Sequence, residues 1–341
     1  MYPNTRNLIT KKRQQGVYPG VNYGFLQGNQ ERFYGEGLAS LLSQKEQMTL
    51  DKRFDVASLT KVVCTTTVLL KLWEQKVITW EDSVKHFLPN FQDSRITLRH
   101  LLTHTANIQT WINNRDQLNA DQLRQAYYGL TAGNKLGQEV KYTDAGTILL
   151  GFMLEEIFQQ DVVEIFKKEV LEPLGMKNSG FLPDKTEIPQ IVPTEVVQGH
   201  LLQGVTHDPK ARVLGRHAGN AGLFTDLGDL ARFCRMLLHH GRNGGGKIFL
   251  QESTIEALLQ DQTPLKNGGR SLGWDLCLGA KNQPALFHTG YTGTFLLIDV
   301  AAQEAFIFLS NRVHPVDRRE AYLYERDQII ACYQKERGII F

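Results

Sequence analysis

A serine and a lysine three residues apart could act as a nucleophile and its proton acceptor. Ser58 and Lys61 form the only S-x-x-K pattern in the chain, between strand-like residues 53–56 and a long helix expected over residues 59–76. At the start of a helix the two side chains share one face, and the N–H of the serine lies at the positive end of the helix dipole. A serine hydroxyl attacks a carbonyl only when a neighbour takes its proton, and a lysine does so only when its pKa is lowered. Alone, the pair fits a nucleophilic site, but it fits a helix cap followed by a solvated lysine better.

Two more triplets could complete such a site. Tyr142-Thr143-Asp144 precedes an apolar helix expected over residues 147–157, and His288-Thr289-Gly290 follows a short strand-like run. Because the ordinary pKa of tyrosine is about 10, it relays a proton at neutral pH only if a nearby positive charge favours its phenolate. Alone, the first triplet also fits a half-buried tyrosine before an N-capping acid, and the second fits a glycine-rich hairpin.

Together and in this order, the three motifs resemble the serine β-lactamase and penicillin-binding-protein superfamily, in its class C β-lactamase and D,D-peptidase branch. That superfamily carries S-x-x-K, then Y-x-N or a variant, then K-T-G or H-T-G on a strand beside the cleft. Residues 101–105 (L-L-T-H-T) and 218–225 (A-G-N-A-G-L-F-T) are similar to further segments of this branch. The resemblance covers about residues 10–335.

The resemblance implies a covalent mechanism, in which Ser58 attacks a carbonyl and forms an acyl-enzyme that water or another acceptor resolves. Lys61 and Tyr142 would share the proton transfers, and the sequence leaves open which of them is the base. The oxyanion hole would consist of the backbone N–H groups of Ser58 and Tyr291. The residues implied in substrate binding are Asp144, His288, Thr289 and Gly290.

Two residues depart from typical class C β-lactamases. His288 stands where those enzymes carry lysine, and in this it resembles D,D-peptidases and D-aminopeptidases of the branch. Because the ordinary pKa of histidine is about 6.5, we expect the charge of His288, and its attraction for an anionic substrate, to change near neutral pH. Asp144 replaces the usual asparagine, so its carboxylate could repel an anionic substrate or neutralise Lys61. The loss of the lysine at His288 argues against efficient β-lactam hydrolysis, and the two departures together leave the choice of substrate open.

We therefore expect a serine hydrolase that acts on D-amino-acid peptides or on related amides and esters, with β-lactams as covalent ligands. One alternative keeps the fold but makes the protein an esterase or a weak class C-type β-lactamase. Another is a sensor or binding module without catalysis. The intact Ser58, Lys61 and Tyr142 argue against that last alternative, because a decayed site usually loses one of these residues.

The elements that must position these residues predict an α+β fold. Strands are expected near residues 20–27 and 31–37, and again over 271–278, 285–288, 294–300 and 304–310. Helices are expected over 5–15 and 317–335, with a long helical stretch in the middle of the chain. We expect the strands of both termini to form one antiparallel sheet flanked by helices, an α/β/α sandwich, with an inserted mainly helical domain. Residues 1–70 and 262–341 would form the sandwich, residues 71–261 the helical domain, and the active site the cleft between them.

Composition excludes several other classes of protein. The chain has 341 residues, of which 42% are hydrophobic, and its 38 basic and 36 acidic residues leave a formal charge of +2. This is ordinary globular usage, with no electrostatic case for nucleic acid and no apolar run long enough for a membrane span. The four cysteines form no C-x-x-C pair and are expected to be buried free thiols. No export signal is seen, so we expect a cytoplasmic protein, or an extracytoplasmic one if an export segment has been removed.

Three further patterns carry less weight, and we expect neither a metal nor a cofactor. Residues 241–247 fit G-x-x-x-x-G-K, but Ile248 stands where a P-loop has serine or threonine. His100 and His104 have the spacing of two zinc ligands without the intervening glutamate of H-E-x-x-H, so both are expected to be structural. Arg270 could reach a substrate carboxylate, but a surface position is the plainer expectation.

Overall fold

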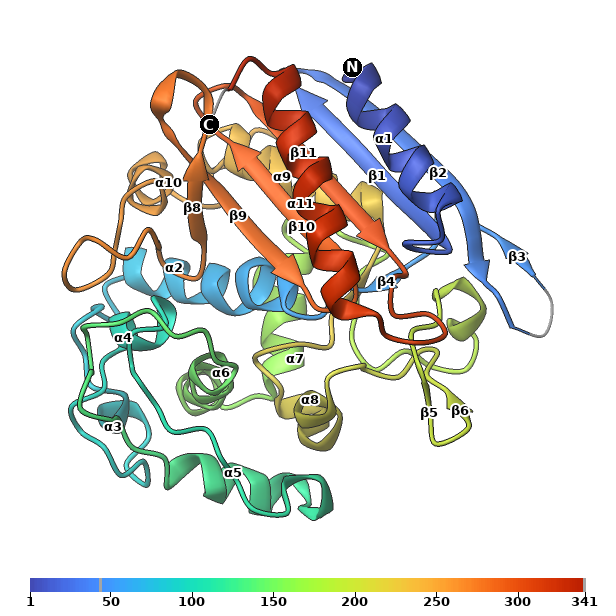
Figure 1. The fold of residues 1–341 in the computed structure, drawn as a ribbon. Coiled ribbons are helices and arrows are strands. Elements are labelled where there is room, and N and C mark those ends of the chain that lie inside the picture. The colour runs from blue at the N-terminus through green and yellow to red at the C-terminus, as the bar shows by residue number, and fades with distance from the viewer. Residues whose placement is uncertain (43–44, 340–341) are drawn as a thin grey trace.

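The computed structural model describes residues 1–42 and 45–339. Within them, seven strands form an antiparallel sheet in the order β3-β2-β1-β11-β10-β9-β8 (Figure 1). Strands from both ends of the chain thus share one sheet, because β1 pairs with β11 from Val21 to Gln27. The fold class predicted from the sequence is confirmed. The strands are β1 Gly20–Gln27, β2 Gln30–Ser40, β3 Glu46–Gln47, β8 Asp275–Leu278, β9 Pro284–Gly290, β10 Thr294–Asp299 and β11 Glu304–Ser310.

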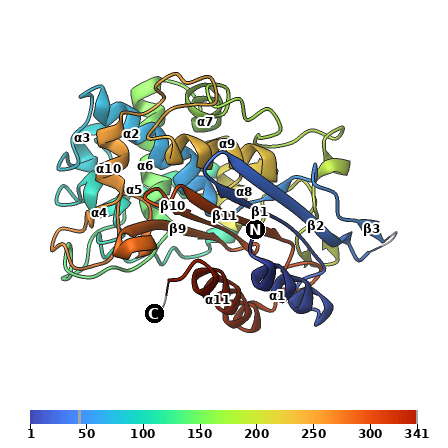
Figure 2. The ribbon, with the colours of Figure 1, turned by 90° about the horizontal axis from the view of Figure 1, so that it is seen from above.

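Helices cover both faces of the sheet, and a further group of helices lies below the sheet in the view of Figure 1. They are α1 Pro3–Gln14, α2 Thr67–Glu74, α3 Val84–Phe87, α4 Leu98–Leu102, α5 Ala120–Tyr128, α6 Ala145–Phe158, α7 Val162–Phe166, α8 Pro209–Leu214, α9 Leu227–Leu238, α10 Glu252–Leu258 and α11 Arg319–Glu336. The helices α1 and α11 lie side by side on one face, and α9 packs against β1, β10 and β11 on the other (Figure 2). No helix in the described part of the chain is both long and apolar enough to cross a membrane.

Alternating side chains on the strands explain this arrangement. On β11, Phe306 and Phe308 belong to the core beneath α1 and α11, whereas Ile307 and Leu309 belong to the larger core on the opposite face. Successive side chains of a strand point to opposite faces, so a strand that is apolar at every position is buried on both sides. This is why β10 and β11 are nearly continuous in hydrophobic residues.

Two expected elements differ at their ends. The long helix begins at residue 59 as predicted, but Lys61–Thr66 form wider π-helical turns before α2, which ends at Glu74. The strand expected from residue 271 begins only at Asp275, because Ser271 donates its backbone N–H to the carbonyl of Trp274 at 2.9 Å in a tight turn. Gly273 makes that turn possible with a φ of 78°.

Candidate active site

Ser58 lies at a sharp bend between a short strand and a helix. The strand β4, Phe54–Asp55, pairs with β7, Phe224–Thr225, and the helix starts directly after the serine. Ala57 adopts a left-handed φ of 47° in the bend, and the buried Asp55 carboxylate accepts its N–H at 2.8 Å. Since non-glycine residues rarely adopt this conformation, the bend is strained and held in place by its surroundings. It leaves the Ser58 side chain partly exposed at the surface of a cleft.

The turn after β9 and the first residue of β10 are hydrogen-bonded directly to this bend. The hydroxyl of Thr292 donates to the carbonyl of Asp55 at 2.6 Å, and that of Thr294 donates to the carbonyl of Val56 at 3.2 Å. A Cβ at Gly290 would collide with the same Val56 carbonyl, so only glycine allows the strand to approach this closely. The strand that carries His288 and Thr289 therefore forms one wall of the cleft beside Ser58.

Lys61 is directed at Ser58 by three contacts. Its Nζ donates to Ser58 Oγ at 2.7 Å and to the carbonyl of Asn220 at 3.0 Å, and it pairs with Asp144 Oδ1 at 2.7 Å. Burial alone would lower the pKa of Lys61, but the nearby Asp144 and Tyr142 outweigh it and raise that pKa above its ordinary value. The protein at rest therefore holds a protonated lysine beside Ser58, whereas the sequence argument required a lysine with a lowered pKa.

Tyr142 reaches the same point from the start of α6. Its ring centroid lies 5.4 Å from Lys61 Nζ, and its side chain is 46% exposed, so a substrate in the cleft can contact it. The ring packs on that of His104, with the centroids 4.5 Å apart. His104 also accepts the N–H of Lys141 through its carbonyl at 2.8 Å and lies with Nδ1 3.4 Å from the N–H of Thr143. His104 thus holds the backbone on both sides of Tyr142.

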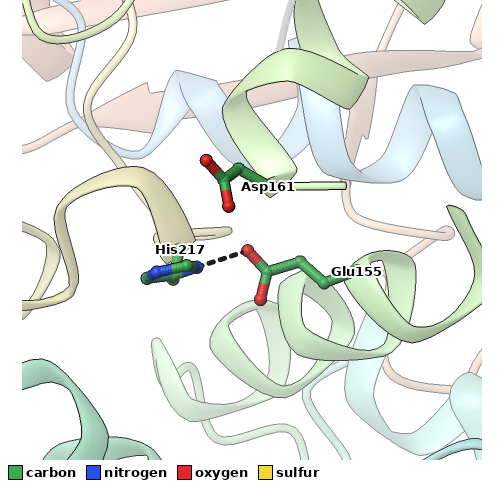
Figure 3. A group of neighbouring side chains, drawn as sticks. All are labelled: Glu155, Asp161 and His217. Atoms are coloured by element: carbon green, nitrogen blue, oxygen red, sulfur yellow. Dashed lines mark hydrogen bonds and ion pairs between the residues drawn. The ribbon is translucent and has the colours of Figure 1, made fainter. Parts of the chain in front are cut away.

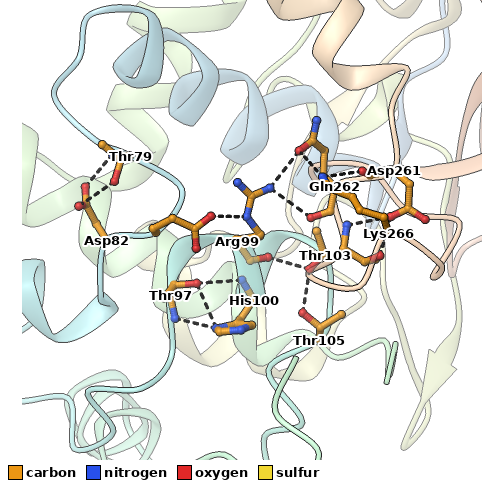
Figure 4. A network of polar contacts seen from close by, with 12 residues as sticks. Thr79, Asp82, Thr97, Arg99, His100, Thr103, Thr105, Asp261, Gln262 and Lys266 are labelled. Carbon is orange, nitrogen blue, oxygen red and sulfur yellow. Dashed lines mark hydrogen bonds and ion pairs between the residues drawn. The ribbon is translucent and has the colours of Figure 1, made fainter. Parts of the chain in front are cut away.

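The two neighbours of His104 in the chain, Thr103 and Thr105, belong to a polar network that fixes this segment (Figure 4). His104 adopts a φ of 56°, between Thr103 and Thr105, whose hydroxyls lie 2.9 Å apart. Thr103 also donates to the carbonyl of Arg99, and Arg99 donates to Gln262 at 2.9 Å. The L-L-T-H-T segment supported the resemblance without an assigned role. In the structure this segment positions residues 141–143, the loop that carries Tyr142.

The expectation that His288 changes its charge near neutral pH is wrong. His288 is 2% exposed, and its ring lies 6.3 Å from the Trp274 ring and 6.2 Å from the Tyr142 ring. Burial, and then the positive charges of Arg270 and Lys61, hold the pKa of His288 well below its ordinary value. The histidine is therefore neutral at neutral pH, and among the described residues neither of its buried ring nitrogens has a hydrogen-bond partner.

We predict that His288 stays unprotonated when the pH of the folded protein is lowered from 8 to 5.5. An NMR titration of the ring nitrogens measures this, with the His288 signal assigned by its loss in His288→Gln. The unfolded chain takes up this proton near pH 6.5, so stability should fall as the pH drops below that value, and less so in the variant. Protonation of the folded His288 ring near pH 6.5 would show that the surrounding charges do not control it.

The two backbone N–H groups expected to form the oxyanion hole come from the bend at Ser58 and from the turn after β9 at Tyr291. Within residues 1–42 and 45–339, neither the N–H of Ser58 nor that of Tyr291 donates a hydrogen bond. The carbonyl of Tyr291 accepts from the Arg312 guanidinium, and its hydroxyl donates to Asp317 at 2.6 Å. Arg312 also pairs with Asp317, so the backbone at Tyr291 is held from behind.

The cleft has a volume of about 350 Å³ and a cationic wall. Arg270, expected at the surface, is only 4% exposed and lies in this wall, with its Nη1 paired to Asp275. It is buried because the tight turn before β8 places it against the Tyr142 ring, whose centroid is 6.0 Å from its guanidinium. Three more arginines line the cleft from the loop after β11 and from α11, namely Arg312, Arg319 and Arg326.

The other sequence patterns have structural explanations. His100 Nδ1 accepts the N–H of Thr97 at 3.1 Å and so caps α4, while His104 faces the tyrosine loop. The G-x-x-x-x-G-K segment follows α9 instead of a strand, and Asn243 closes it by accepting the N–H of Lys247 at 3.0 Å.

A cluster of possible metal ligands lies at the end of α6, away from the cleft. Glu155, Asp161 and His217 face one another, and His217 Nδ1 lies 2.7 Å from Glu155 (Figure 3). Arg124 pairs with Glu155, and Arg216 pairs with Asp161 at 2.5 Å. Because both carboxylates already have cationic partners, an ion-pair network explains the cluster.

Sequence relatives of known name extend over nearly the whole chain. A protein of Escherichia coli strain K12 named "Putative D-alanyl-D-alanine carboxypeptidase" is 27% identical over 383 aligned positions, covering 97% of this chain and 84% of its own length. A protein of the same name from Salmonella typhimurium is 25% identical, covering 87% of this chain and 79% of its own length.

Solved structures share the fold. The hydrolase EstCE1, described as having promiscuous acyltransferase activity, superposes with a TM-score of 0.76 at 19% identity, over 95% of this chain and 97% of its own. A β-lactamase/D-alanine carboxypeptidase from Pseudomonas syringae superposes with a TM-score of 0.75 at 17% identity, over 95% and 97% of the two chains. The Beta-lactamase family matches residues 5–329. The chain therefore belongs to the Beta-lactamase family and is a hydrolase of that family.

Proposed function

We propose that the protein is a serine hydrolase that forms an acyl-enzyme on Ser58. The observation that carries this proposal is the 2.7 Å contact from Lys61 Nζ to Ser58 Oγ at the surface of a cleft. A nucleophile within hydrogen-bonding reach of its proton partner, with that partner oriented by a third group, is the arrangement that nucleophilic catalysis needs. Here the third group is Asp144, which pairs with Lys61 at 2.7 Å.

The reaction would proceed through proton transfer within one pair of residues. Ser58 Oγ attacks the carbonyl carbon while its proton passes to the Lys61–Tyr142 pair, and the same pair returns a proton to the leaving group. The negative charge that develops on the carbonyl oxygen would be stabilised by the N–H groups of Ser58 and Tyr291. Water then attacks the acyl carbon, and the proton path runs in reverse. Because the resting Lys61 is protonated, the pair must lose one proton before it can accept that of Ser58.

We infer that the cleft takes substrates with a negative charge, such as peptides ending in a D-amino acid carboxylate. Four arginines and one acid, Asp275, line it. Three of the arginines pair with acids, namely Arg270 with Asp275, Arg312 with Asp317 and Arg326 with Asp327. Arg319 has no acidic partner in the described part of the chain, so it leaves a positive charge that attracts anions. The sequence relatives bear the name of a carboxypeptidase. Asp144 would not repel such a substrate, because Lys61 and Lys210 hold it as an ion pair. His288, Thr289 and Gly290 would bind the substrate along β9.

The proposed site combines two parts of the chain. Ser58 and Tyr291 belong to the terminal segments 1–70 and 262–341, which carry the sheet, and Tyr142 and Asp144 belong to the mainly helical segment 71–261. We propose that these segments act as two domains with the substrate between them.

A second candidate function is that of an esterase or a weak β-lactamase, which follows from the neutral His288. An ester needs no cation in the wall of β9, where class C enzymes carry a lysine. β-Lactams would still acylate Ser58 and remain as slowly released covalent ligands. The two candidates are separated by measuring kcat/KM side by side for a D-Ala-D-Ala peptide, a short-chain nitrophenyl ester and a chromogenic cephalosporin. Peptide turnover supports the first candidate, and ester turnover alone supports the second.

Arg319 provides a direct test of anion binding. It is exposed on the first turn of α11, lines the cleft, and has its guanidinium 5.8 Å from the Tyr291 ring centroid. Arg319→Gln should raise KM for the D-Ala-D-Ala peptide by about three- to tenfold, the range for one charge-assisted contact at a partly exposed position. It should leave the neutral ester unchanged. Arg318→Gln is the matched control, because Arg318 is equally exposed but does not line the cleft. Equal effects of both variants, or on both substrates, would refute a specific contact.

A further inference from the structure

Lys61 belongs to a closed ring of polar contacts that extends behind the site. Its ammonium contacts Oδ1 of Asp144 at 2.7 Å, and Lys210 contacts Oδ2 of the same carboxylate at 3.0 Å. Lys210 also contacts Asp208 at 2.8 Å. Asn220 closes the ring: its side-chain amide donates to Asp208 at 3.2 Å, and its carbonyl accepts from Lys61 at 3.0 Å.

Lys210 occupies an unusual position for a lysine in the first turn of a helix. Asp208 caps α8 by accepting the N–H of Ala211 at 2.8 Å, and Pro209 opens the helix. A lysine at such a place ordinarily keeps its ammonium in water. The side chain of Lys210 is instead only 16% exposed and lies between two carboxylates, one of which also binds Lys61. The proposed chemistry at Ser58 does not by itself need this second lysine.

Two cations on one carboxylate influence each other. The charge of Asp144 holds the proton on Lys61, and a second positive charge on the other oxygen opposes this effect. Each lysine forms an ion pair with Asp144, and the two ammonium groups, being of like charge, also repel each other. Removing Lys210 would leave the full charge of Asp144 to act on the Lys61–Tyr142 pair, which would then hold its proton more tightly.

We propose that Lys210 is a positioning residue for Lys61: it shares the Asp144 carboxylate, so that Lys61 stays directed at Ser58 and the Lys61–Tyr142 pair can give up a proton. The inference rests on the proposed function, because it assigns Lys210 a part in activating Ser58. It also explains how this site works with an aspartate at a position where the resemblance leads one to expect asparagine. The asparagine carries no charge, and here Lys210 offsets the charge of its replacement.

The other ionisable groups around Lys61 do not replace the effect of the Lys210 charge on the proton of the Lys61–Tyr142 pair. His104 and His288 face it from the loop after α4 and from β9, and both are neutral because burial holds their pKa values well below the ordinary range. Arg270 contributes a permanent charge from the turn before β8. Lys141 and Arg115 line the pocket on the other side of Asp144. Since Lys210 contacts the same carboxylate as Lys61, its removal changes the nearest charge in this set.

The experiment measures the rate at which a neutral fluorophosphonate labels Ser58 between pH 6 and 12, because the raised pKa of Lys61 requires the profile to be followed to its upper plateau. In this step Ser58 Oγ bonds to phosphorus, fluoride leaves, and the serine proton passes to the Lys61–Tyr142 pair. The rate should therefore rise with pH as that pair loses one proton. Lys210→Met, Lys210→Arg and Asp208→Asn are compared with the unchanged protein, and circular dichroism checks that each variant is folded.

Lys210→Met and Asp208→Asn should shift the pH at which the labelling rate rises, and the two shifts should be in opposite directions. Lys210→Met removes a cation and should shift the rise to higher pH by about one unit, which makes labelling about tenfold slower at a fixed pH below it. Asp208→Asn removes an anion and should shift it to lower pH. Lys210→Arg should restore the profile of the unchanged protein. A purely structural role would slow labelling at every pH without moving the rise.

The inference would be overturned if the labelling rate of Lys210→Met rose at the same pH as that of the unchanged protein. It would also be overturned if Lys210→Met and Asp208→Asn shifted this pH in the same direction. If Lys210→Met does not fold, Asp208→Asn decides alone: a downward shift supports the inference and an unmoved rise overturns it. Absence of labelling at Ser58 in the unchanged protein would instead remove the proposed function, and this inference with it. If Ser58 is labelled but the pH dependence of labelling is the same in the variants, the proposed function stands and only this inference fails.

Discussion

Ser58→Ala should lower kcat/KM for every hydrolysed substrate by at least about 10⁴-fold while leaving the fold unchanged. The substitution removes the atom that forms the covalent bond, and removal of a nucleophile from a cooperating set typically has an effect of this size. Ser58 is partly exposed and its Oγ contacts Lys61, so its loss leaves no buried polar group without water or another partner. The measurement is steady-state hydrolysis of a nitrophenyl ester, with thermal unfolding as the check on folding.

A serine elsewhere supplies the control for this result. Ser253 is exposed on α10, far from the lining of the cleft, and Ser253→Ala should keep full activity. If Ser58→Ala retained more than about a tenth of the activity, Ser58 would not be the nucleophile. A loss of activity together with a large drop in thermal stability would point to damage at the strained bend of Ala57 instead.

Lys61→Met and Tyr142→Phe should each lower kcat/KM by about 10² to 10⁴-fold, and the double variant should be little worse than either. General acid–base groups contribute factors of this size, and groups that act as a unit are strongly non-additive. Lys61 Nζ lies 5.4 Å from the Tyr142 ring centroid, so the two side chains are close enough to share one proton path. After Lys61→Met, Lys210 still pairs with Asp144, so the buried carboxylate keeps a cationic partner.

Losses that multiply in the double variant would show that the two residues act independently. The three variants are measured by ester hydrolysis and by the rate of fluorophosphonate labelling, which isolates acylation from the later steps. Tyr324→Phe is the matched control, because Tyr324 is an exposed tyrosine of α11 at 65% exposure. It should show activity equal to that of the unchanged protein.

The fold and the residues next to Ser58 could be predicted because they follow from local sequence. The contact between Ser58 and Lys61 needs only a bend followed by a helix, and three-residue spacing then brings the side chains together. The antiparallel sheet shared by the two ends of the chain was predictable, because strands at both termini are most simply paired with one another. Tyr142 and His288 required the order of the motifs, since nothing local indicates that they meet Ser58.

The charges in the site could not be predicted, because they depend on neighbours that are distant in sequence. His288 is neutral because Trp274 and Arg270 come from the turn before β8, and that turn replaced the first part of an expected strand. Lys61 is protonated because Asp144 lies at the start of α6. Lys210 belongs to no motif, and only the packing of α8 brings it to Asp144.

The central claim is that Ser58 forms a covalent acyl-enzyme-like bond, and mass spectrometry of the intact protein tests it most directly. After incubation with a fluorophosphonate, and in parallel with benzylpenicillin, the protein should gain the mass of one probe molecule. Proteolysis should place that adduct on the peptide that contains Ser58, and Ser58→Ala should gain no mass. An adduct on another residue, or the same gain in mass in Ser58→Ala, would contradict the account.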